Sequence, residues 1–539
     1  MTRPLRTLSA LAIALGFFAA APASTAFAHA GLDSSAPAAN SVLEVAPSEI
    51  VLDFDESVEV ALAQIELVDG SGTRIQVGTP RGGSDDSIVT AALPTLSEGL
   101  YGVVWRTSSI DGHAVAGSFA FQIGTAGGAD TEEFLDSLDA ELGSPGYIRW
   151  LHTAARWIAF MGIVLLLGSG IWAVRSGAGL RLLTSTRRLT WAGWIALWVG
   201  SVFTFLLHGA EAHAGGFGSA LDPHVWNDML STRTGSLIVL RMLLAVALGL
   251  LLSLGLHRSD RLWRVSAVAA SVMVLMSFSF AGHASSATPS GLWQLLDLVH
   301  LGGVVVWVGG LAVFGLASAE WYSGDESDAA IARFSRWSVV IVPVVAVTGL
   351  LAAREHSDGF ADITSTDWGR TLLVKVVLVA VLVAVSGVSR WMLRHHGVAS
   401  IRRTVLAEAV VGVLVLALVA GMVGESPRQA TASRSYAEQL AAGGLIAAVS
   451  IGPGHVGANE IHVVVTPQGG SLEPVASAEA RVANEAAGLP ASPVALADEG
   501  PNHFSGSVTF PAAGEWTLEL IVETADGDTV LMSGTVVIP

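Results

Sequence analysis

The stretch GLWQLLDLVHLGGVVVWVGGLAVFGLAS, residues 291–318, decides what kind of protein this chain is. Its only formally charged residue is Asp297, and its only histidine is His300. A helix needs about 20 apolar residues to cross the hydrocarbon core of a bilayer, which is about 30 Å thick. The stretch therefore predicts a transmembrane helix. At about 1.5 Å per residue, His300 would lie roughly 14 Å deep, with Asp297 one turn away on the same helix face.

Seven further apolar stretches of similar length accompany it. The chain has 539 residues, of which 52% are hydrophobic and 14% are charged, so it is too apolar for an ordinary soluble protein. We expect a multidomain protein with an eight-helix transmembrane bundle over residues 147–424. The predicted spans are 147–174, 187–208, 233–256, 262–283, 291–318, 334–353, 369–393 and 402–424.

Arginine placement predicts the orientation of this bundle. The first, third, fifth and seventh connections between spans carry most of its arginines, whereas the second, fourth and sixth hold few positive charges and several acids. Connections rich in Lys and Arg stay in the cytoplasm. We therefore expect a multi-pass protein of the cytoplasmic membrane, with both flanking segments extracytoplasmic.

The net charge of −18 is unevenly distributed. Residues 29–146 carry 19 acidic and 3 basic side chains, residues 425–539 carry 13 and 3, and residues 147–424 carry 14 and 20. Acidic flanks argue against nucleic acid as a partner. They suit outer domains that attract cations, although an acidic surface can also serve only to keep a domain soluble.

Histidines gather in the outer half of the predicted bundle. Imidazole is the commonest protein metal ligand, and an ionisable residue inside a membrane is a functional hypothesis by default. The chain has no cysteine, which excludes disulfides and thiolate metal sites. We therefore expect a metal path that enters from outside. The inner face has only His257, His395 and His396, whereas the outer half has His152, His208, His213, His224, His283, His300 and His356.

Residues 1–28 have the pattern of a secretory signal peptide. Arg3 and Arg6 precede a short apolar run, and Ala26-Phe27-Ala28 is an A-x-A cleavage motif. Cleavage there makes His29 the mature N-terminus. Its α-amine and imidazole could then bind one metal ion together, although a histidine near a cut site is often incidental.

Residues 29–128 are expected to form an all-β sandwich, followed by a linker over 129–146. Short strand-like runs lie between Gly and Pro punctuation, as at Asp69-Gly70 and Thr79-Pro80.

This domain resembles the CopC family of copper-resistance proteins in several motifs: His29-Ala30, Ser34-Ser35-Ala36-Pro37, Leu52-Asp53-Phe54 and Ser109-Ile110-Asp111-Gly112-His113-Ala114-Val115-Ala116-Gly117. The resemblance implies a cupredoxin-like or immunoglobulin-like sandwich that binds Cu(II) with His29, Asp111 and His113. Nitrogen and oxygen donors in a tetragonal plane suit Cu(II). Residues 29–146 contain no methionine, so we expect the Met-rich Cu(I) site of some family members to be absent.

The membrane block also has an internal repeat. Ser231-Thr232, Gly235 and Arg241 have the same spacing as Ser365-Thr366, Gly369 and Lys375. His152 near the start of span one parallels His300 in span five. Two four-helix halves in parallel orientation would place binding sites between them. Arg241 and Lys375, the deep cations, either pair with Asp297 or stabilise the fold.

Eight residues are candidates for a transport path through the bundle. Thioether suits Cu(I), and imidazole suits either oxidation state. The alternatives are core packing for methionine, a structural pair for His300 with Asp297, and a solvated loop for the outer-mouth residues. The candidates are His152, His300, Asp297, His208, Glu211, His213, His283 and Met276.

The block resembles the CopD family in its eight spans, Asp297-x-x-His300, Trp307-Val308-Gly309-Gly310-Leu311 and Gly369-Arg370 with Lys375. The resemblance implies a CopC–CopD fusion associated with copper uptake. Residues 425–539 contain four strand-like runs and look like the small immunoglobulin-like β-sandwich that ends some of these fusions. Their His455, His462 and His503 are either scattered surface residues or a second metal-acceptance site.

We therefore expect a copper transport protein that captures Cu(II) outside and passes copper inward, and no enzymatic activity. The expected partners are copper ions, the lipid bilayer and extracytoplasmic copper chaperones. The sequence has no P-loop, so ATP coupling is not expected. Two alternatives remain: an electron-transfer protein with b-type haem between paired histidines, and a copper-binding or sensing protein without transport.

The terminal-amine ligand gives a first prediction. Adding one residue before His29 of the mature chain removes its α-amine from the site, so Cu(II) affinity should fall strongly. Calorimetric titration of the mature chain with Cu(II) measures this. Unchanged affinity would exclude the terminal amine as a ligand.

Overall fold

The computed structural model describes most of the chain from residue 31 to residue 538. Outside the description lie residues 1–30, 125–133, 176–183, 256–260, 283–288, 317–324, 356–362, 426–435 and 468–474, together with several shorter gaps, one of which is Asp111. The chain divides into two compact units. One contains Ser108–Ala114 with the helical region up to Gln429, and the other contains the remaining parts of the two β domains.

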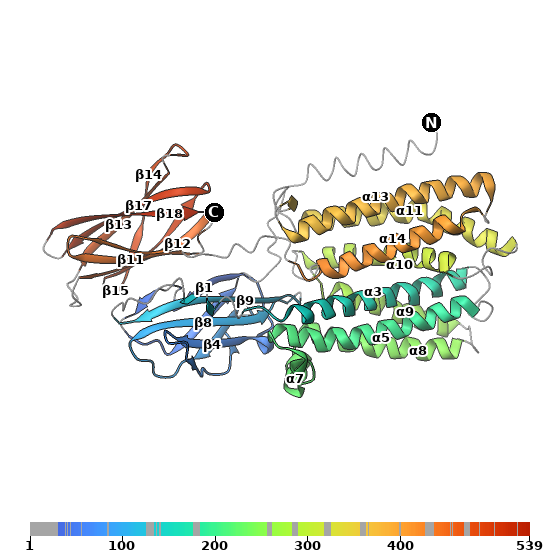
Figure 1. Cartoon of the computed structure of the whole chain (residues 1–539), viewed down its shortest axis with the longest axis horizontal. Helices are drawn as coiled ribbons and strands as arrows, with labels where there is room; N and C mark the ends of the chain where they lie inside the picture. The colour runs from blue at the N-terminus through green and yellow to red at the C-terminus, as the bar shows by residue number, and fades with distance from the viewer. Residues whose placement is uncertain are drawn as a thin grey trace. The chain divides into compact units, whose positions relative to one another are not determined.

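In the part of the membrane block that the structure describes, eight long helices lie side by side in one bundle (Figure 1). Each is long and apolar enough to cross a membrane, which confirms the prediction of eight spans. The short helices α6 (Phe217–Ala220) and α7 (Pro223–Ser231) lie between α5 and α8. The eight are α3 (Gly146–Arg175), α5 (Thr184–Ala212), α8 (Arg233–Gly255), α9 (Arg261–Ser279), α10 (Ser290–Leu316), α11 (Asp325–Glu355), α13 (Asp367–His396) and α14 (Arg402–Met422).

Glycines allow the central helices to approach closely. A Cβ atom on Gly309 of α10 would lie 2.6 Å from the Cα of Gly168 on α3 and 2.8 Å from the carbonyl oxygen of Val164. Similarly, a Cβ atom on Gly162 of α3 would lie 2.2 Å from the backbone nitrogen of Leu197 on α5. Small residues at such crossings are typical of membrane helix packing. Helix α3 thus packs against both halves of the bundle.

The repeated Ser-Thr-x-x-Gly motif has the same structural role in both halves. The Thr232 hydroxyl accepts a hydrogen bond from the backbone N–H of Gly235 at 2.9 Å, and Thr366 accepts one from Gly369 at 2.9 Å. Each threonine therefore caps the start of a long helix, α8 or α13. The sequence repeat corresponds to a repeated helix start.

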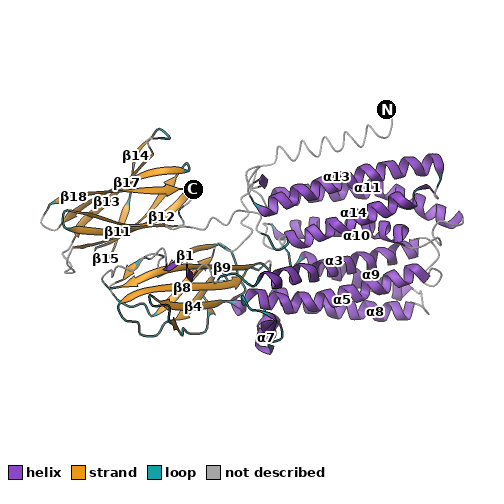
Figure 2. Ribbon diagram, viewed as in Figure 1, coloured by secondary structure: helices purple, strands orange, loops and turns teal. Residues whose placement is uncertain are grey.

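The first β domain has two sheets (Figure 2). Their strand orders are β1-β3-β7-β6 and β2-β9-β8-β4-β5, and side chains such as Ile50, Phe54 and Phe121 form the core between them. In the segment predicted as a linker, Leu138 is buried against Val68 and Val104 of this domain. The strands are β1 (Leu32–Ala36), β2 (Val42–Leu43), β3 (Glu49–Phe54), β4 (Gln64–Asp69), β5 (Arg74–Ile75), β6 (Arg81–Gly82), β7 (Ile88–Ala92), β8 (Gly99–Ser108) and β9 (Ala114–Ile123).

The C-terminal domain is a second two-sheet β structure, as expected. Its strand orders are β10-β11-β12-β16-β15 and β14-β13-β17-β18, with a core that includes Phe510 and Trp516. Its strands are β10 (Tyr436–Ala442), β11 (Leu445–Gly452), β12 (Gly457–Pro467), β13 (Val475–Asn484), β14 (Leu489–Val494), β15 (Leu496–Gly500), β16 (His503–Phe510), β17 (Gly514–Thr524) and β18 (Thr529–Ile538).

The crossing of α3 and α10 gives a prediction about stability. Gly309→Ala places a methyl group against the backbone of α3, and overpacking of this kind costs about 1–3 kcal/mol. The melting temperature of the purified protein in detergent should therefore fall. Gly302→Ala is the matched control on the same helix, because no described neighbour lies within 4 Å of its added methyl group. Equal melting temperatures for the two variants would contradict this packing.

Candidate functional site

The loop between β8 and β9 carries the Asp-Gly-His motif. The backbone N–H of Ser109 donates to the carbonyl of His113 at 2.8 Å, and the N–H of Gly112 donates to the carbonyl of Ser109 at 2.9 Å. Gly112 has a φ of +89°, which residues with side chains rarely adopt. A Cβ atom on Gly112 would lie 3.4 Å from the side chain of Thr234 in α8. The glycine therefore closes the turn and lets it approach the helices.

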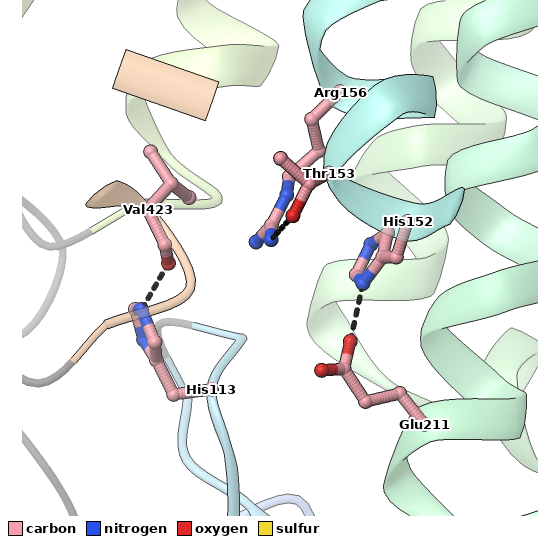
Figure 3. Close-up of polar contacts among 6 residues, drawn as sticks. All are labelled: His113, His152, Thr153, Arg156, Glu211 and Val423. Atoms are coloured by element: carbon pink, nitrogen blue, oxygen red, sulfur yellow. Dashed lines mark hydrogen bonds and ion pairs between the residues drawn. The ribbon is translucent and has the colours of Figure 1, made fainter. Parts of the chain in front are cut away.

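His113 is buried at one end of the helix bundle. It is 7% exposed, and its Nε2 contacts the carbonyl oxygen of Val423, the residue that caps the C-terminus of α14 (Figure 3). Helices α3 and α8 begin at this end, and α5 and α14 end there. We call it the His113 end, and the other the opposite end.

His152 and Glu211 form a close pair at the His113 end. His152 lies in the second turn of α3, and its Nδ1 contacts Oε2 of Glu211 in the last turn of α5 (Figure 3). Helix α5 ends at Ala212, beyond the predicted end of its span at His208, because Ala and Glu favour helix. The ring of His208 lies edge-on to that of His152, with 5.5 Å between their centroids.

Arg156 completes this group. It is one turn after His152 on α3, and its Nη2 donates to the Thr153 hydroxyl at 3.4 Å (Figure 3). Arg156 interacts electrostatically with His152, His208 and Glu211, and His113 interacts electrostatically with both histidines. These five side chains lie at the His113 end of the bundle, and we call them the histidine cluster: His113, His152, Arg156, His208 and Glu211.

The histidine cluster has donors that copper accepts. His208 is 4% exposed, and its Nε2 has no hydrogen-bond partner among the described residues. A buried polar atom of this kind calls for an explanation, and a bound ion is one. No group of three or more His, Asp or Glu side chains in the described part of the chain is already arranged around a metal position. Imidazole and carboxylate donors are therefore present in the cluster but are not arranged around a common metal position in the described part of the chain.

His213 and Met276 lie elsewhere. The Nδ1 of His213 contacts the carbonyl of Gly209 at 3.0 Å, and its Nε2 lies 3.5 Å from Oδ2 of Asp228. Met276 is half-buried in the last turn of α9. His213 therefore contacts Gly209 of its own helix and Asp228 of α7, at the edge of the bundle.

A second polar group lies within the other half of the bundle. Nδ1 of His300 on α10 is 3.0 Å from the Thr348 hydroxyl on α11, and a Cβ atom on Gly349 would lie 3.0 Å from the imidazole ring. Lys375 of α13 interacts electrostatically with His300 and with Asp297. The repeat thus supplies a polar histidine site in each half.

Arg241 stabilises the fold. Its Nε donates to the Ser277 hydroxyl at 3.0 Å, its Nη2 donates to the Ser277 carbonyl at 2.9 Å, and its guanidinium lies 3.5 Å from the centroid of Phe278. These contacts join α8 to α9, so they favour a structural role for Arg241 over pairing with Asp297.

Two of the three predicted Cu(II) ligands, His29 and Asp111, lie outside the described residues, as does His283. Their assignment stays a prediction. Sequence reasoning did not identify Arg156 as part of the site. The sequence feature that could have identified Arg156 is its spacing of four residues from His152 within an apolar span, because this spacing places both residues on one helix face.

Three family models match the chain. The CopC domain matches residues 32–124, the Copper resistance protein D-like N-terminal domain matches residues 147–292, and Copper resistance protein D matches residues 328–422.

Individual proteins show the same likeness. Copper transport protein CutJ of Bacillus subtilis (strain 168) is 28% identical over 462 residues, which cover 83% of each chain. Copper resistance protein C of Pseudomonas syringae pv. tomato is 31% identical over 103 residues, which cover 18% of this chain and 81% of that protein. The crystal structure of CopC from Methylosinus trichosporium OB3b covers 18% of this chain and 93% of its own, at 30% identity and a TM-score of 0.17.

The His152–Glu211 pair gives a prediction about stability in the absence of metal. Glu211→Ala leaves the imidazole of buried His152 without its carboxylate, which should destabilise the protein by about 1–3 kcal/mol. Asp228→Ala is the control, because Asp228 faces a more exposed histidine at 3.5 Å. Thermal unfolding in detergent compares the two. An equal, small effect in both variants would show that the buried pair is not stabilising.

Proposed function

We propose that this chain, which joins a CopC domain to a CopD membrane domain as a copper transport and resistance protein would, imports copper across the cytoplasmic membrane. The CopC domain would capture Cu(II) outside the cell with His29, Asp111 and His113, loaded from free ions or from extracytoplasmic chaperones. The membrane domain would then carry copper inward.

The single observation that carries this proposal is the presence of His113 in the histidine cluster. His113 is the expected Cu(II) ligand that lies in the described part of the chain, and it interacts electrostatically with His152 and His208 of the membrane helices. A copper ion that leaves His113 would find two imidazoles as its next ligands. Such an exchange replaces one nitrogen donor by another, so the ion need not return to water.

The composition of the cluster also supports a transfer step. Glu211 can compensate the positive charge of an arriving ion, and His152 must leave Glu211 before its Nδ1 can bind metal. The unpartnered Nε2 of His208 is available without such a rearrangement. His208 is therefore the first acceptor in this proposal, and His152 the second.

The second polar group would serve as the next stop. His300 lies roughly mid-membrane by its place in α10, and Asp297 lies one turn before it. When Lys375 nearby is protonated, its positive charge would disfavour a long stay of a cation. Imidazole accepts Cu(I) as well as Cu(II), so this part of the path would suit reduced copper.

The orientation follows from the arginine distribution. The odd connections, rich in arginine, would lie in the cytoplasm, so the His113 end would face outward together with both β domains. An outward His113 end fits capture outside and release at the opposite end.

Copper uptake into vesicles of defined orientation tests the proposal. With the His113 end outside, the wild-type protein should accumulate copper. The double variant His152→Ala with His208→Ala should still bind Cu(II) at the CopC domain but lose uptake by at least about tenfold, because removed metal-site groups typically cost 10–100-fold. His224→Ala, an exposed histidine of α7, is the matched control. Wild-type uptake in the double variant would overturn the transfer route, and no uptake by the wild type would overturn transport.

A further inference from the structure

A buried carboxyl group lies near the opposite end of the bundle, away from the histidine cluster. Glu408 is 3% exposed and lies six residues into α14, about 9 Å along the helix from its first residue. Its Oε2 contacts the Ser386 hydroxyl of α13, and its Oε1 contacts the Ser389 hydroxyl of the same helix. An ionised carboxylate is costly to bury in a membrane protein and marks a functional site by default.

The hydroxyl groups near Glu408 form a continuous series of hydrogen-bonded side chains. The Ser389 and Thr404 hydroxyl oxygens are 2.7 Å apart, and the Thr404 hydroxyl donates to the carbonyl of Ile401 at 2.9 Å. Ile401 is the residue immediately before α14. This series of hydroxyls therefore leads from the buried carboxyl towards the first residue of α14.

The number of available hydrogens favours a protonated Glu408. Four contacts join these groups, and each needs one hydrogen, but Ser386, Ser389 and Thr404 supply only three. A carbonyl cannot donate, so the Thr404 hydrogen is used on Ile401. The Ser389 hydrogen is then used on Thr404. Ser389 then has one hydrogen for two neighbours, Thr404 and Glu408, and a protonated carboxyl that donates to Ser389 satisfies both contacts.

No cation neutralises this carboxyl. In the described part of the chain, the Glu408 carboxyl contacts only the hydroxyls of Ser386 and Ser389. Arg390 of α13 donates instead to the Ser335 carbonyl and hydroxyl on α11. The halves of α3 and α10 nearer the opposite end carry no titratable residue among the side chains that the structure describes. The remaining charged or titratable groups at this end of α13 and α14 are exposed: Arg394, His395, His396, Arg402 and Arg403.

The geometry points to Glu408 as a proton-binding site that releases its proton when copper passes the opposite end of the bundle. This inference rests on the proposed transport function. The O–H bond of the carboxyl breaks as its proton moves to Ser389, and the Ser389 hydrogen moves to Thr404. Thr404, which is half-buried, turns its own hydrogen from the Ile401 carbonyl and releases it to water at the end of α14. The carboxylate then compensates the charge of the ion. A proton from the same water restores the carboxyl after the ion has left. No net proton crosses the membrane, so uptake depends on the pH at the opposite end.

Infrared spectroscopy of the copper-free protein tests the proton directly. A carbonyl stretching band of a protonated carboxyl should be present in the wild type and absent from Glu408→Gln. Glutamine keeps the fold, because its amide can donate the fourth hydrogen to Ser389. Asp367→Asn, which alters an exposed carboxylate at the start of α13, should retain the band. No band that depends on Glu408 would overturn the site.

Uptake as a function of pH inside oriented vesicles tests the coupling. Wild-type uptake should rise as the pH at the opposite end rises, because the carboxyl must release its proton. Glu408→Gln should be as slow as the wild type at low pH and show no pH dependence, whereas Glu408→Asp should regain it. Equal pH dependence in the wild type and Glu408→Gln would overturn the coupling. Absence of wild-type uptake would instead overturn the transport proposal, and the infrared result would still decide the proton site.

Discussion

A polar side chain inside a membrane helix must find a partner within the protein, because hydrocarbon offers none. This constraint explains most of the buried polar contacts in the bundle. Arg241 satisfies its guanidinium on Ser277 and Phe278, His152 meets Glu211, and Glu408 meets two serines. Each of these contacts joins two helices, so the buried polar groups also help to hold the bundle together.

The exceptions to this constraint are informative. The buried Nε2 of His208 lacks a partner among the described residues, and it lies in the same cluster as His113. An incompletely satisfied histidine next to an expected copper ligand is what a transfer site requires, since a fully satisfied one would have no free donor for the ion. At the opposite end, the hydroxyl chain around Glu408 has one contact more than its hydroxyl hydrogens can supply. The proposals therefore assign one cation to each end of the bundle, copper at the His113 end and a proton at the opposite end.

Much of the fold could be predicted from the sequence. The eight spans follow from apolar length alone, and strands such as Ile50–Phe54 follow from Gly and Pro punctuation around β-branched runs. The repeated threonine motif was visible as a spacing, and the structure gives its cause, a helix cap in each half. In the site, His152, His208 and Glu211 were candidates from the sequence, because ionisable residues are rare in apolar spans, and the structure brings the three together.

Contacts between distant helices could not be predicted in this way. His152 and Glu211 are 59 residues apart, and their pairing depends on which faces of α3 and α5 meet and on the extension of α5 to Ala212. The role of Arg156 and the serine partners of Glu408 depend on the same information. Periodicity locates a residue on its own helix, but only packing decides what that residue faces.

The central claim is that the histidine cluster accepts copper, and the copper stoichiometry of the full mature chain tests it most directly. After loading and removal of free metal, the wild type should retain one more copper ion than the variant that carries both His152→Ala and His208→Ala, and the CopC site should remain filled in both. Equal copper content in the two proteins would contradict the claim.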